Sequence, residues 1–425
     1  LPEGDRSIEM VRLMVDVLWI TRIKIRNDDL IRDGMQTLKI AEEMGYKQEQ
    51  AVLYAYIDCW QSLLGNSSGE YEKKAMSIVQ ELGDNPRMAW VCFVFGFAKQ
   101  WASDFFLSEQ SIPYYIKAIE MAERTGYIYL IGYAHIMLGS TYSSLEQYDK
   151  SIENFDLGLD IVEETKSLFP LTFVNDLMGV YAKQGRDDMV ISTFRRIMQI
   201  FNSVEIDNES YGMTLLHRGV ITSTYNFFYL YHTFMEKESE FPRIALENLN
   251  ELLKGAKSQV QKAWYHHELM FLNILLSDIS AAKDHAREII SIYESLDCPD
   301  YMTGLNFAYM TIGDAKKSIE TGIRYVNMIS DTILYIGNIF IDYFVRSAYF
   351  YNRLGYGDVF QEFAKQVGQN MPENLSKIGF SQLVIEPVIL AKPDHILFFD
   401  DFTRDPLEMG WEWVNTKSNN SYELE

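Results

Sequence analysis

The chain has 425 residues, of which 48% are apolar and 23% are charged. This composition is typical of a folded protein and excludes a disordered acidic chain, because there is ample apolar side chain to bury. The 38 basic and 60 acidic residues give a formal charge of −22, which argues against nucleic-acid binding because phosphate groups attract basic surfaces.

The cellular location is inferred from what the sequence lacks. The sequence contains no basic stretch followed by an apolar core, so it gives no sign of a secretory signal. It also contains no run of about 20 mostly apolar residues, so no membrane span is predicted. The three cysteines, Cys59, Cys92 and Cys298, are too widely spaced for a metal motif, and they favour buried, reduced thiols. We therefore expect a cytoplasmic protein that does not bind membranes.

Four amphipathic segments repeat along the first half of the chain. Each carries its stripe at positions i, i+3, i+7 and i+10, which lie on one face of a helix. They begin at Ile31, Ile112, Ile152 and Ile191, so that successive starts are 81, 40 and 39 residues apart. Because 81 residues is close to two periods, this spacing predicts a helical repeat of about 40 residues.

Glycines recur at two phases of the same repeat. Gly45 and Gly126 follow the similar words AEEM and AERT, where each helix should end because glycine tolerates the left-handed conformation. Gly139 and Gly179 lie 40 residues apart inside the preceding helices. A glycine inside a helix costs about 1 kcal/mol relative to alanine, so its recurrence predicts close approach of two helices.

The second half of the chain repeats less regularly. Stripes beginning at Leu246, Ala282 and Ala315 alternate with more uniformly apolar segments at 264–276 and 333–350. Short breaks separate them at residues 278, 297–299, 313–314 and 355–358. We expect an all-α protein of about eighteen helices, or nine antiparallel pairs, over residues 1–370.

The composition changes after residue 370. Residues 371–393 contain β-branched runs interrupted by Pro387 and Pro393, which predict an extended linker. Residues 394–425 contain the words FFDDF and GWEWV, which predict strands joined by a turn. Because about 30 residues cannot close a β-sandwich, we interpret this segment as a fragment of a larger β domain.

The repeating unit resembles a long form of the tetratricopeptide repeat. The family's pattern of small, aromatic and Leu-Gly positions is filled by Leu138, Gly139, Tyr142, Ser151, Phe155 and Gly158. The resemblance implies a right-handed α-solenoid, like those of bacterial and archaeal signalling ATPases, protein kinases and transcription regulators. The segment 394–425 resembles the opening of a concanavalin-like β-sandwich, which is sometimes appended to such proteins.

The resemblance also implies where a partner binds. In this family, ligands lie on a curved surface formed by the first helix of each pair. The implied groove residues are Tyr133, Ser140, Ser143, Phe173, Asp176 and Lys183. The family's carboxylate clamp needs Lys, Asn and Arg, but its places hold Ile136, Met137, Ser140 and Leu177. An acidic tail is therefore not expected here, and the net charge favours a basic or aromatic-rich protein or peptide.

Catalytic and metal-binding motifs are absent from the sequence. It has no phosphate-binding loop and no nucleophile elbow, so we expect neither an enzyme nor a cofactor. His266, His267 and Glu268 form the most tempting cluster, but adjacent helical side chains point about 100° apart and cannot easily share one metal ion. His285 lies on an apolar stripe and is predicted to be a hydrogen-bonded core residue.

Two hypotheses about function remain open. The first is a non-catalytic interaction module or scaffold, acting as the sensor or partner-binding part of a larger signalling protein. The alternative is the scaffold of a carbohydrate-binding or carbohydrate-processing protein, whose active domain begins at residue 394. Asp400, Asp401 and Glu412 would then be read as glycosidase carboxylates, although Asp400 and Asp401 fall at the edge of the first strand. The sequence leaves the oligomeric state open.

Overall fold

A computed structural model describes residues 6–21, 27–63, 67–102, 109–203, 241–256, 258–296, 302–332, 347 and 350–369. Contacts between Cα atoms divide the chain into two compact units, whose described parts fall within residues 6–203 and 241–369. Apart from short turns, the described residues are helical and contain no strand, which confirms the all-α class. The predicted linker at 371–393 and the β segment at 394–425 lie outside these residues.

The first unit is a succession of helices of 9 to 18 residues with two short 3-10 helices. Its described elements are α1 (Ile8–Thr21), α2 (Asn27–Met44), α3 (Lys47–Leu63), α4 (Glu70–Leu82), α5 (Pro86–Ala102), η1 (Glu109–Ser111), α6 (Ile112–Thr125), α7 (Ile128–Ser144), α8 (Tyr148–Thr165), η2 (Phe169–Phe173), α9 (Asn175–Lys183) and α10 (Asp187–Ser203).

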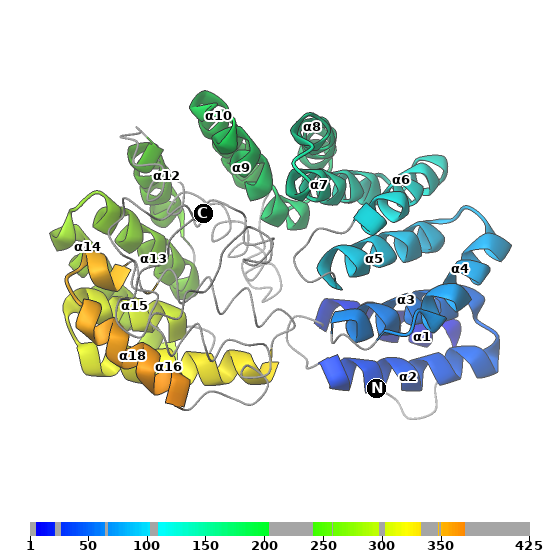
Figure 1. Ribbon diagram of the computed structural model, residues 1–425, viewed down its shortest axis with the longest axis horizontal. Helices are drawn as coiled ribbons and strands as arrows, with labels where there is room; N and C mark the ends of the chain where they lie inside the picture. Colours follow the sequence, from blue (N-terminus) through cyan, green and yellow to red (C-terminus); the bar gives the residue numbers. More distant parts are fainter. Residues whose placement is uncertain are drawn as a thin grey trace, which may run out of the picture. The chain divides into compact units, whose positions relative to one another are not determined.

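These helices form pairs that stack along the unit (Figure 1). The pairs are α3 with α4, α5 with α6, α7 with α8, and α9 with α10. The first helices α3, α5, α7 and α9 pack on one another in order, and each second helix also packs on the first helix of the next pair. Each pair therefore hides its apolar face against its neighbours, as in helical repeat proteins.

The predicted stripes and helix ends lie where this packing requires them. Phe155 and Leu159 of α8 and Phe194 of α10 are all buried in the core. Gly45 and Gly126 follow α2 and α6 with a φ of 70°, as predicted for left-handed helix ends. The sequence therefore located both the buried faces and the ends of these helices.

Glycine sets the close approach of α7 and α8. A Cβ atom on Gly139 would lie 2.9 Å from Cδ2 of Phe155, and one on Gly158 would lie 2.6 Å from Cγ1 of Ile136. Both distances are too short for a real side chain. The close approach predicted from Gly139 is confirmed.

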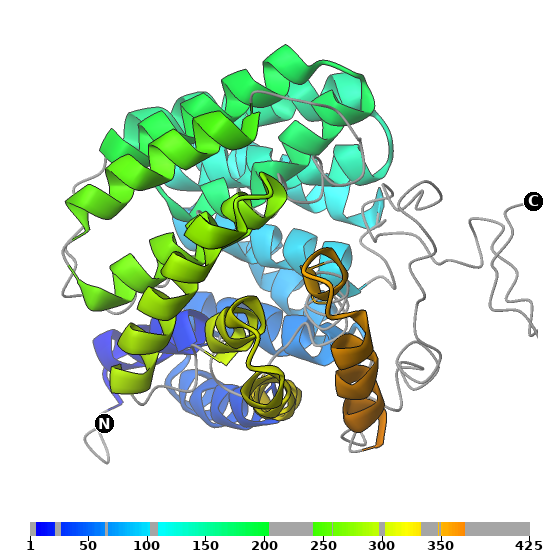
Figure 2. The ribbon, with the colours of Figure 1, turned by 90° about the vertical axis from the view of Figure 1, so that its left-hand side faces the viewer.

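The second unit continues the same pairing (Figure 2). Its described elements are α12 (Phe241–Gly255), α13 (Gln259–Leu275), α14 (Ile279–Leu296), α15 (Met302–Ile312), α16 (Ala315–Thr332) and α18 (Gly357–Gln369). α13 pairs with α14 and α15 with α16, α13 packs on α15, and α16 packs on α18. The number of pairs and the right-handed solenoid stay predictions, because residues 204–240 and 333–346 lie outside the described part.

The interior of the second unit is partly polar. Nδ2 of Asn306 donates to the carbonyl oxygen of Ser318 at 2.7 Å and to the hydroxyl of Tyr351 at 3.2 Å. The three side chains are almost completely buried. Next to them, a Cβ atom on Gly322 would lie 2.7 Å from Cε2 of Phe363. Hydrogen bonds and one aromatic ring therefore fill this interface.

No helix among the described residues is both long and apolar enough to cross a membrane.

Candidate functional site

A row of aromatic side chains runs along the first helices of the first unit. We call it the aromatic row, and it comprises Trp19, Tyr56, Trp90, Phe93, Tyr133, Phe169 and Phe173. The ring centroids of Trp19 and Tyr56 are 4.8 Å apart, and those of Phe93 and Tyr133 are 4.4 Å apart. Tyr133 then contacts Phe173, with centroids 6.1 Å apart. Rings at these distances are in contact, so the row links α1 to η2.

The predicted groove residues divide into two sets by exposure. Tyr133, Ser140 and Ser143 on α7 are 1%, 7% and 9% exposed, so they are buried. Phe173 on η2 and Asp176 and Lys183 on α9 are half-buried. The structure therefore brings three of the predicted residues to the accessible surface and places the other three beneath it.

A line of hydrogen bonds connects the two sets. The hydroxyl of Tyr115 donates to Oε1 of Gln100 at 2.7 Å, and Nε2 of Gln100 donates to Oγ of Ser140 at 3.4 Å. The Ser140 hydroxyl donates in turn to Oδ2 of Asp176. This polar line joins α6, α5, α7 and α9, and it fixes the Asp176 carboxylate relative to buried groups. Sequence reasoning missed Gln100, whose signal was a polar residue inside the apolar segment of α5.

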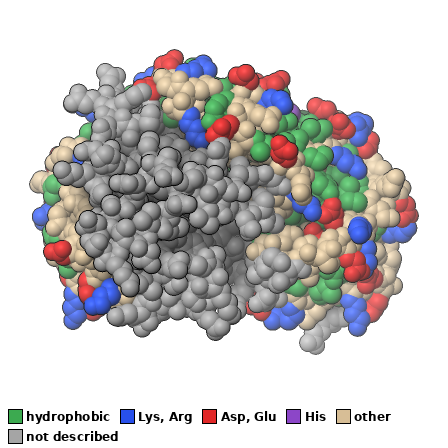
Figure 3. Space-filling view, in the orientation of Figure 1, with side chains coloured by type: hydrophobic (Ala, Val, Ile, Leu, Met, Phe, Trp, Pro, Cys, Tyr) green, Lys and Arg blue, Asp and Glu red, His purple; other side chains and the backbone are tan. Residues whose placement is uncertain are grey.

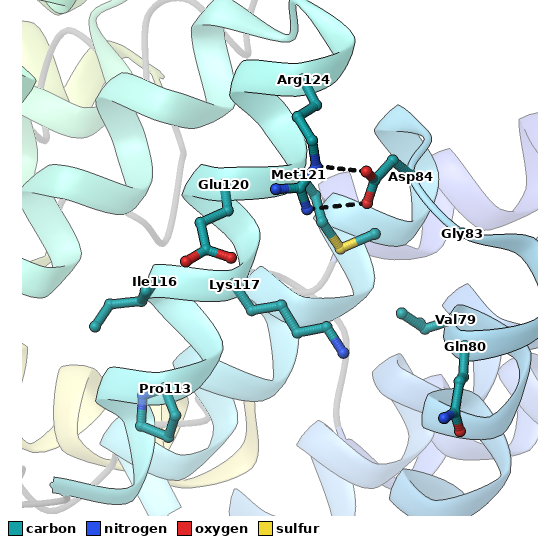
Figure 4. Close-up of a pocket in the computed structure, with 10 residues that line it drawn as sticks. All are labelled: Val79, Gln80, Gly83, Asp84, Pro113, Ile116, Lys117, Glu120, Met121 and Arg124. Atoms are coloured by element: carbon teal, nitrogen blue, oxygen red, sulfur yellow. Dashed lines mark hydrogen bonds and ion pairs between the residues drawn. The ribbon is translucent and has the colours of Figure 1, made fainter.

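A second surface feature is a cleft of about 510 Å³ between α4 and α6, the second helices of adjacent pairs (Figure 4). Its apolar lining comes from Val79 of α4 and from Pro113, Ile116 and Met121 of α6. Ile116 is 41% exposed, whereas Val79 and Met121 are almost fully buried. Sequence reasoning missed this cleft, because its lining comes from two helices that meet only in the fold.

The polar lining of the α4–α6 cleft contains charges of both signs. Nε and Nη2 of Arg124 both donate to the carboxylate of Asp84, so this pair is bidentate. Lys117 extends from α6 toward the side of the cleft where Val79 and Gln80 lie (Figure 4). Among the described residues, no carboxylate lies within ion-pairing distance of Lys117. Glu120 completes the charged lining.

In the structure, His266 and His267 make separate contacts with different partners. Nδ1 of His266 lies 2.9 Å from Nδ1 of His285, and Nδ1 of His267 lies 3.2 Å from Oε1 of Glu268. Burial lowers the pKa of His266, and burial together with His266 lowers the pKa of His285 to about 4. His285 makes the expected hydrogen bond, although the sequence did not indicate its partner. Within the described ranges, no group of three or more His, Cys, Asp or Glu side chains is arranged to hold a metal ion.

The thiols described by the structure lie in the core. Cys59 and Cys92 are buried and are not in a disulfide bond, and burial raises the pKa of Cys92 to about 11. A thiol with this pKa is almost entirely protonated near neutral pH. Cys92 is therefore a poor nucleophile. Cys298 lies outside the described residues.

The face shown in Figure 3 carries acidic and basic side chains intermixed across the described residues, with apolar side chains between them. On this face the described surface shows no continuous basic patch.

The comparisons with known proteins define the class only broadly. No protein-family model matches the chain. A stretch of 94 residues is 29% identical to response regulator aspartate phosphatase I of Bacillus subtilis (strain 168), and it covers 21% of this chain and 22% of that protein. The match therefore spans about a fifth of the length of this curated relative. The similarity and the stacked helix pairs fit a helical repeat protein of the tetratricopeptide type.

Proposed function

We propose that the chain is a non-catalytic interaction module that binds a protein partner on the first-helix face of its first unit. In this proposal it is the partner-binding part of a larger signalling protein in the cytoplasm. The observation that carries the proposal is that the aromatic row ends at Phe173 and the polar line ends at Asp176, a few positions further along the chain. Both run from buried side chains to these half-buried residues.

This arrangement suits recognition better than chemistry. The buried Tyr133 packs against Phe173, and the Ser140 hydroxyl orients the Asp176 carboxylate. Groups held in position lose little freedom when a partner binds, which favours affinity. Phe173 offers an apolar contact, and Asp176 offers a negative charge to a basic side chain. A basic, aromatic-rich segment is therefore the partner of choice, in keeping with the net charge of −22.

The similarity to a curated protein supports a partner in signalling. That relative is named for action on response regulators. Under this proposal, a response regulator is the first partner to test. The relative is also named as a phosphatase, whereas the present proposal assigns binding without catalysis, so both properties need measurement.

The test uses purified full-length chain and response regulators from the source organism. We expect binding by titration calorimetry, weakened about tenfold by Phe173→Ala and by Asp176→Asn, the size of effect seen for central interface residues. Asp149→Asn is the matched control, because Asp149 is exposed on α8 outside this face.

Three results would contradict the proposal. Unchanged binding by both first-face variants would move the contact elsewhere. Absence of binding to any signalling protein would remove the partner class. Loss of phosphate from a phosphorylated response regulator, catalysed by the chain, would replace a binding module with an enzyme.

A further inference from the structure

The first unit holds an acidic side chain in its interior, Asp58 of α3, which is 0% exposed. Oδ1 of Asp58 accepts a hydrogen bond from the hydroxyl of Ser67 at 2.9 Å. Its other oxygen, Oδ2, is buried and has no hydrogen-bond partner among the described residues. A carboxylate taken out of water normally needs several donors or a cation in contact, because burying an unpaired charge is costly. These contacts are therefore too few for an ionised group.

The cation that acts on Asp58 is bound to a different carboxylate. Nζ of Lys99 on α5 donates to Oε2 of Glu72 on α4 at 2.6 Å, and the hydroxyl of Tyr114 on α6 donates to Oε1 of Glu72. Burial raises the pKa of Glu72, but these two hydrogen bonds lower it below its ordinary value. Lys73, which is exposed on α4, also lowers it. Glu72 is therefore the ionised carboxylate of this group.

Asp58 and Glu72 thus differ in their surroundings. No cation of the described residues lies within ion-pairing distance of Asp58. Burial raises the pKa of Asp58, and the charge of Glu72 raises it further. The hydrogen bond from Ser67 and the charge of Lys99 act in the opposite direction without reversing the shift. Two carboxyl groups with separate environments can then hold different protonation states at one pH.

We propose that Asp58 carries a proton in the folded protein at neutral pH, and that its loss in alkaline solution draws Lys99 from Glu72 toward Asp58 and loosens α4 from α5. A protonated carboxyl is neutral, so it can be buried at far lower cost than a carboxylate. Ionised Asp58 would be a second buried anion that competes for Lys99. Because Lys99 joins α5 to α4 through Glu72, moving it weakens that link.

The pH dependence follows from the direction of the shift. The folded chain keeps the Asp58 proton at pH values where the unfolded chain, with an ordinary pKa of 3.8, has lost it. The stability that protonated Asp58 supplies is therefore lost as pH rises toward the pKa of the folded state. This is opposite to the usual behaviour of an ion-paired carboxylate such as Glu72.

Infrared spectroscopy of the full chain at neutral pH tests for the proton directly, because a protonated carboxyl has a C=O stretch separate from the bands of carboxylates. We expect a protonated-carboxyl band that shifts on isotope labelling of aspartate and that Asp58→Asn removes. Glu72→Gln should also remove it, because Lys99 is then free to bind ionised Asp58. Asp149→Asn is the matched control, since Asp149 is exposed on α8, and it should leave the band in place.

Chemical unfolding between about pH 5 and about pH 7 measures the consequence for stability. The unfolding constant of the wild-type chain should rise by up to about tenfold per pH unit relative to that of Asp58→Asn, because unfolding releases one proton. In alkaline solution, hydrogen exchange should show α4 opening more in the wild-type chain than in Asp58→Asn at the same pH.

The outcomes that would overturn the proposal are specific. One is the absence of a protonated aspartate band at neutral pH, and another is a band that Asp58→Asn leaves in place. Parallel pH profiles of the wild-type chain and Asp58→Asn would overturn it too. If Asp58→Asn does not fold, the isotope label still tests for the proton, and a band retained in Glu72→Gln would contradict the movement of Lys99.

Discussion

The α7–α8 pair of the first unit and the α15–α16 pair of the second unit each contain a serine-to-carbonyl hydrogen bond at the same place. Oγ of Ser151 donates to the carbonyl oxygen of Gly139 at 2.8 Å, and Oγ of Ser318 donates to that of Asn306 at 3.0 Å. In each pair, the donor lies 12 residues after the acceptor. The two pairs are therefore aligned at equivalent positions of the repeat.

At these equivalent positions the large and small residues are exchanged. Phe155 covers Gly139 in the first pair, whereas Asn306 faces Gly322 in the second. Phe363 of α18 fills the remaining space beside Gly322. The two pairs thus fill equivalent positions of the repeat with different residues. The first unit uses an aromatic ring on glycine, and the second uses buried hydrogen bonds.

The largest expected effect is on the aromatic contact of the first unit, between Phe155 and Gly139. Phe155→Ala should lower the free energy of unfolding by about 3–5 kcal/mol, because it opens a cavity over Gly139. Thermal and urea unfolding would measure the change. Leu157→Ala on the same helix is the control, since Leu157 is 45% exposed, and it should change stability by less than about 0.5 kcal/mol. Similar losses for the two variants would show that Phe155 is not the centre of this interface.

Acid should distinguish the two units. The pKa of His285 is lowered to about 4, so between its ordinary value of 6.5 and 4 the unfolded chain binds a proton that the folded chain does not. Stability supplied by neutral His285 is therefore lost as pH falls through this window, by about 1–3 kcal/mol. Hydrogen exchange should show α13 and α14 opening more at pH 5 than at pH 7. His285→Gln should remove most of this pH dependence, and an unchanged profile would refute the assignment.

Adding a methyl group at Gly322 in the second unit should lower the stability of the protein. Gly322→Ala places a methyl group 2.7 Å from Phe363 and 2.9 Å from Nδ2 of Asn306. We expect a net loss of about 1–2 kcal/mol, because crowding exceeds the gain in helix propensity. Gly255→Ala at the end of α12 is the control, since no atom lies within 4 Å of its Cβ position. It should stabilise the protein by up to about 1 kcal/mol, and equal behaviour of the two variants would contradict the packing argument.

The smallest expected effects come from the two equivalent serines, Ser151 and Ser318, which also give the most direct comparison of the two units. Ser151→Ala should cost about 1 kcal/mol, the value of one hydrogen bond. Ser318→Ala should cost about 1 kcal/mol more, because Ser318 also contacts Asn306 and Tyr351, which are left with fewer partners. Chemical denaturation of both variants measures the difference. Equal costs would show that the polar interior of the second unit is not a connected network.

The sequence predicted local features well and the candidate site only in part. The stripe containing Phe155 and the helix ends at Gly45 and Gly126 follow from short-range periodicity and from backbone conformation. The groove residues Tyr133 and Ser140 were placed on the correct helix, but their burial depends on neighbouring pairs. Their contact with a partner stays a prediction. The contact of His266 with His285 joins two helices whose relative rotation no local pattern specifies.

By itself, the sequence determined that this protein is built of paired helices, where many of those helices end, and which stripe of each is hidden. These features follow from the period of the α-helix and from glycine's tolerance of positive φ, both of which act over a few residues. Only the tertiary structure decided which side chains meet between helices. Lys117 faces the α4–α6 cleft, Asp176 receives the end of the polar line, and Gly322 lies under Phe363 because packing fixes how neighbouring helices are rotated and spaced.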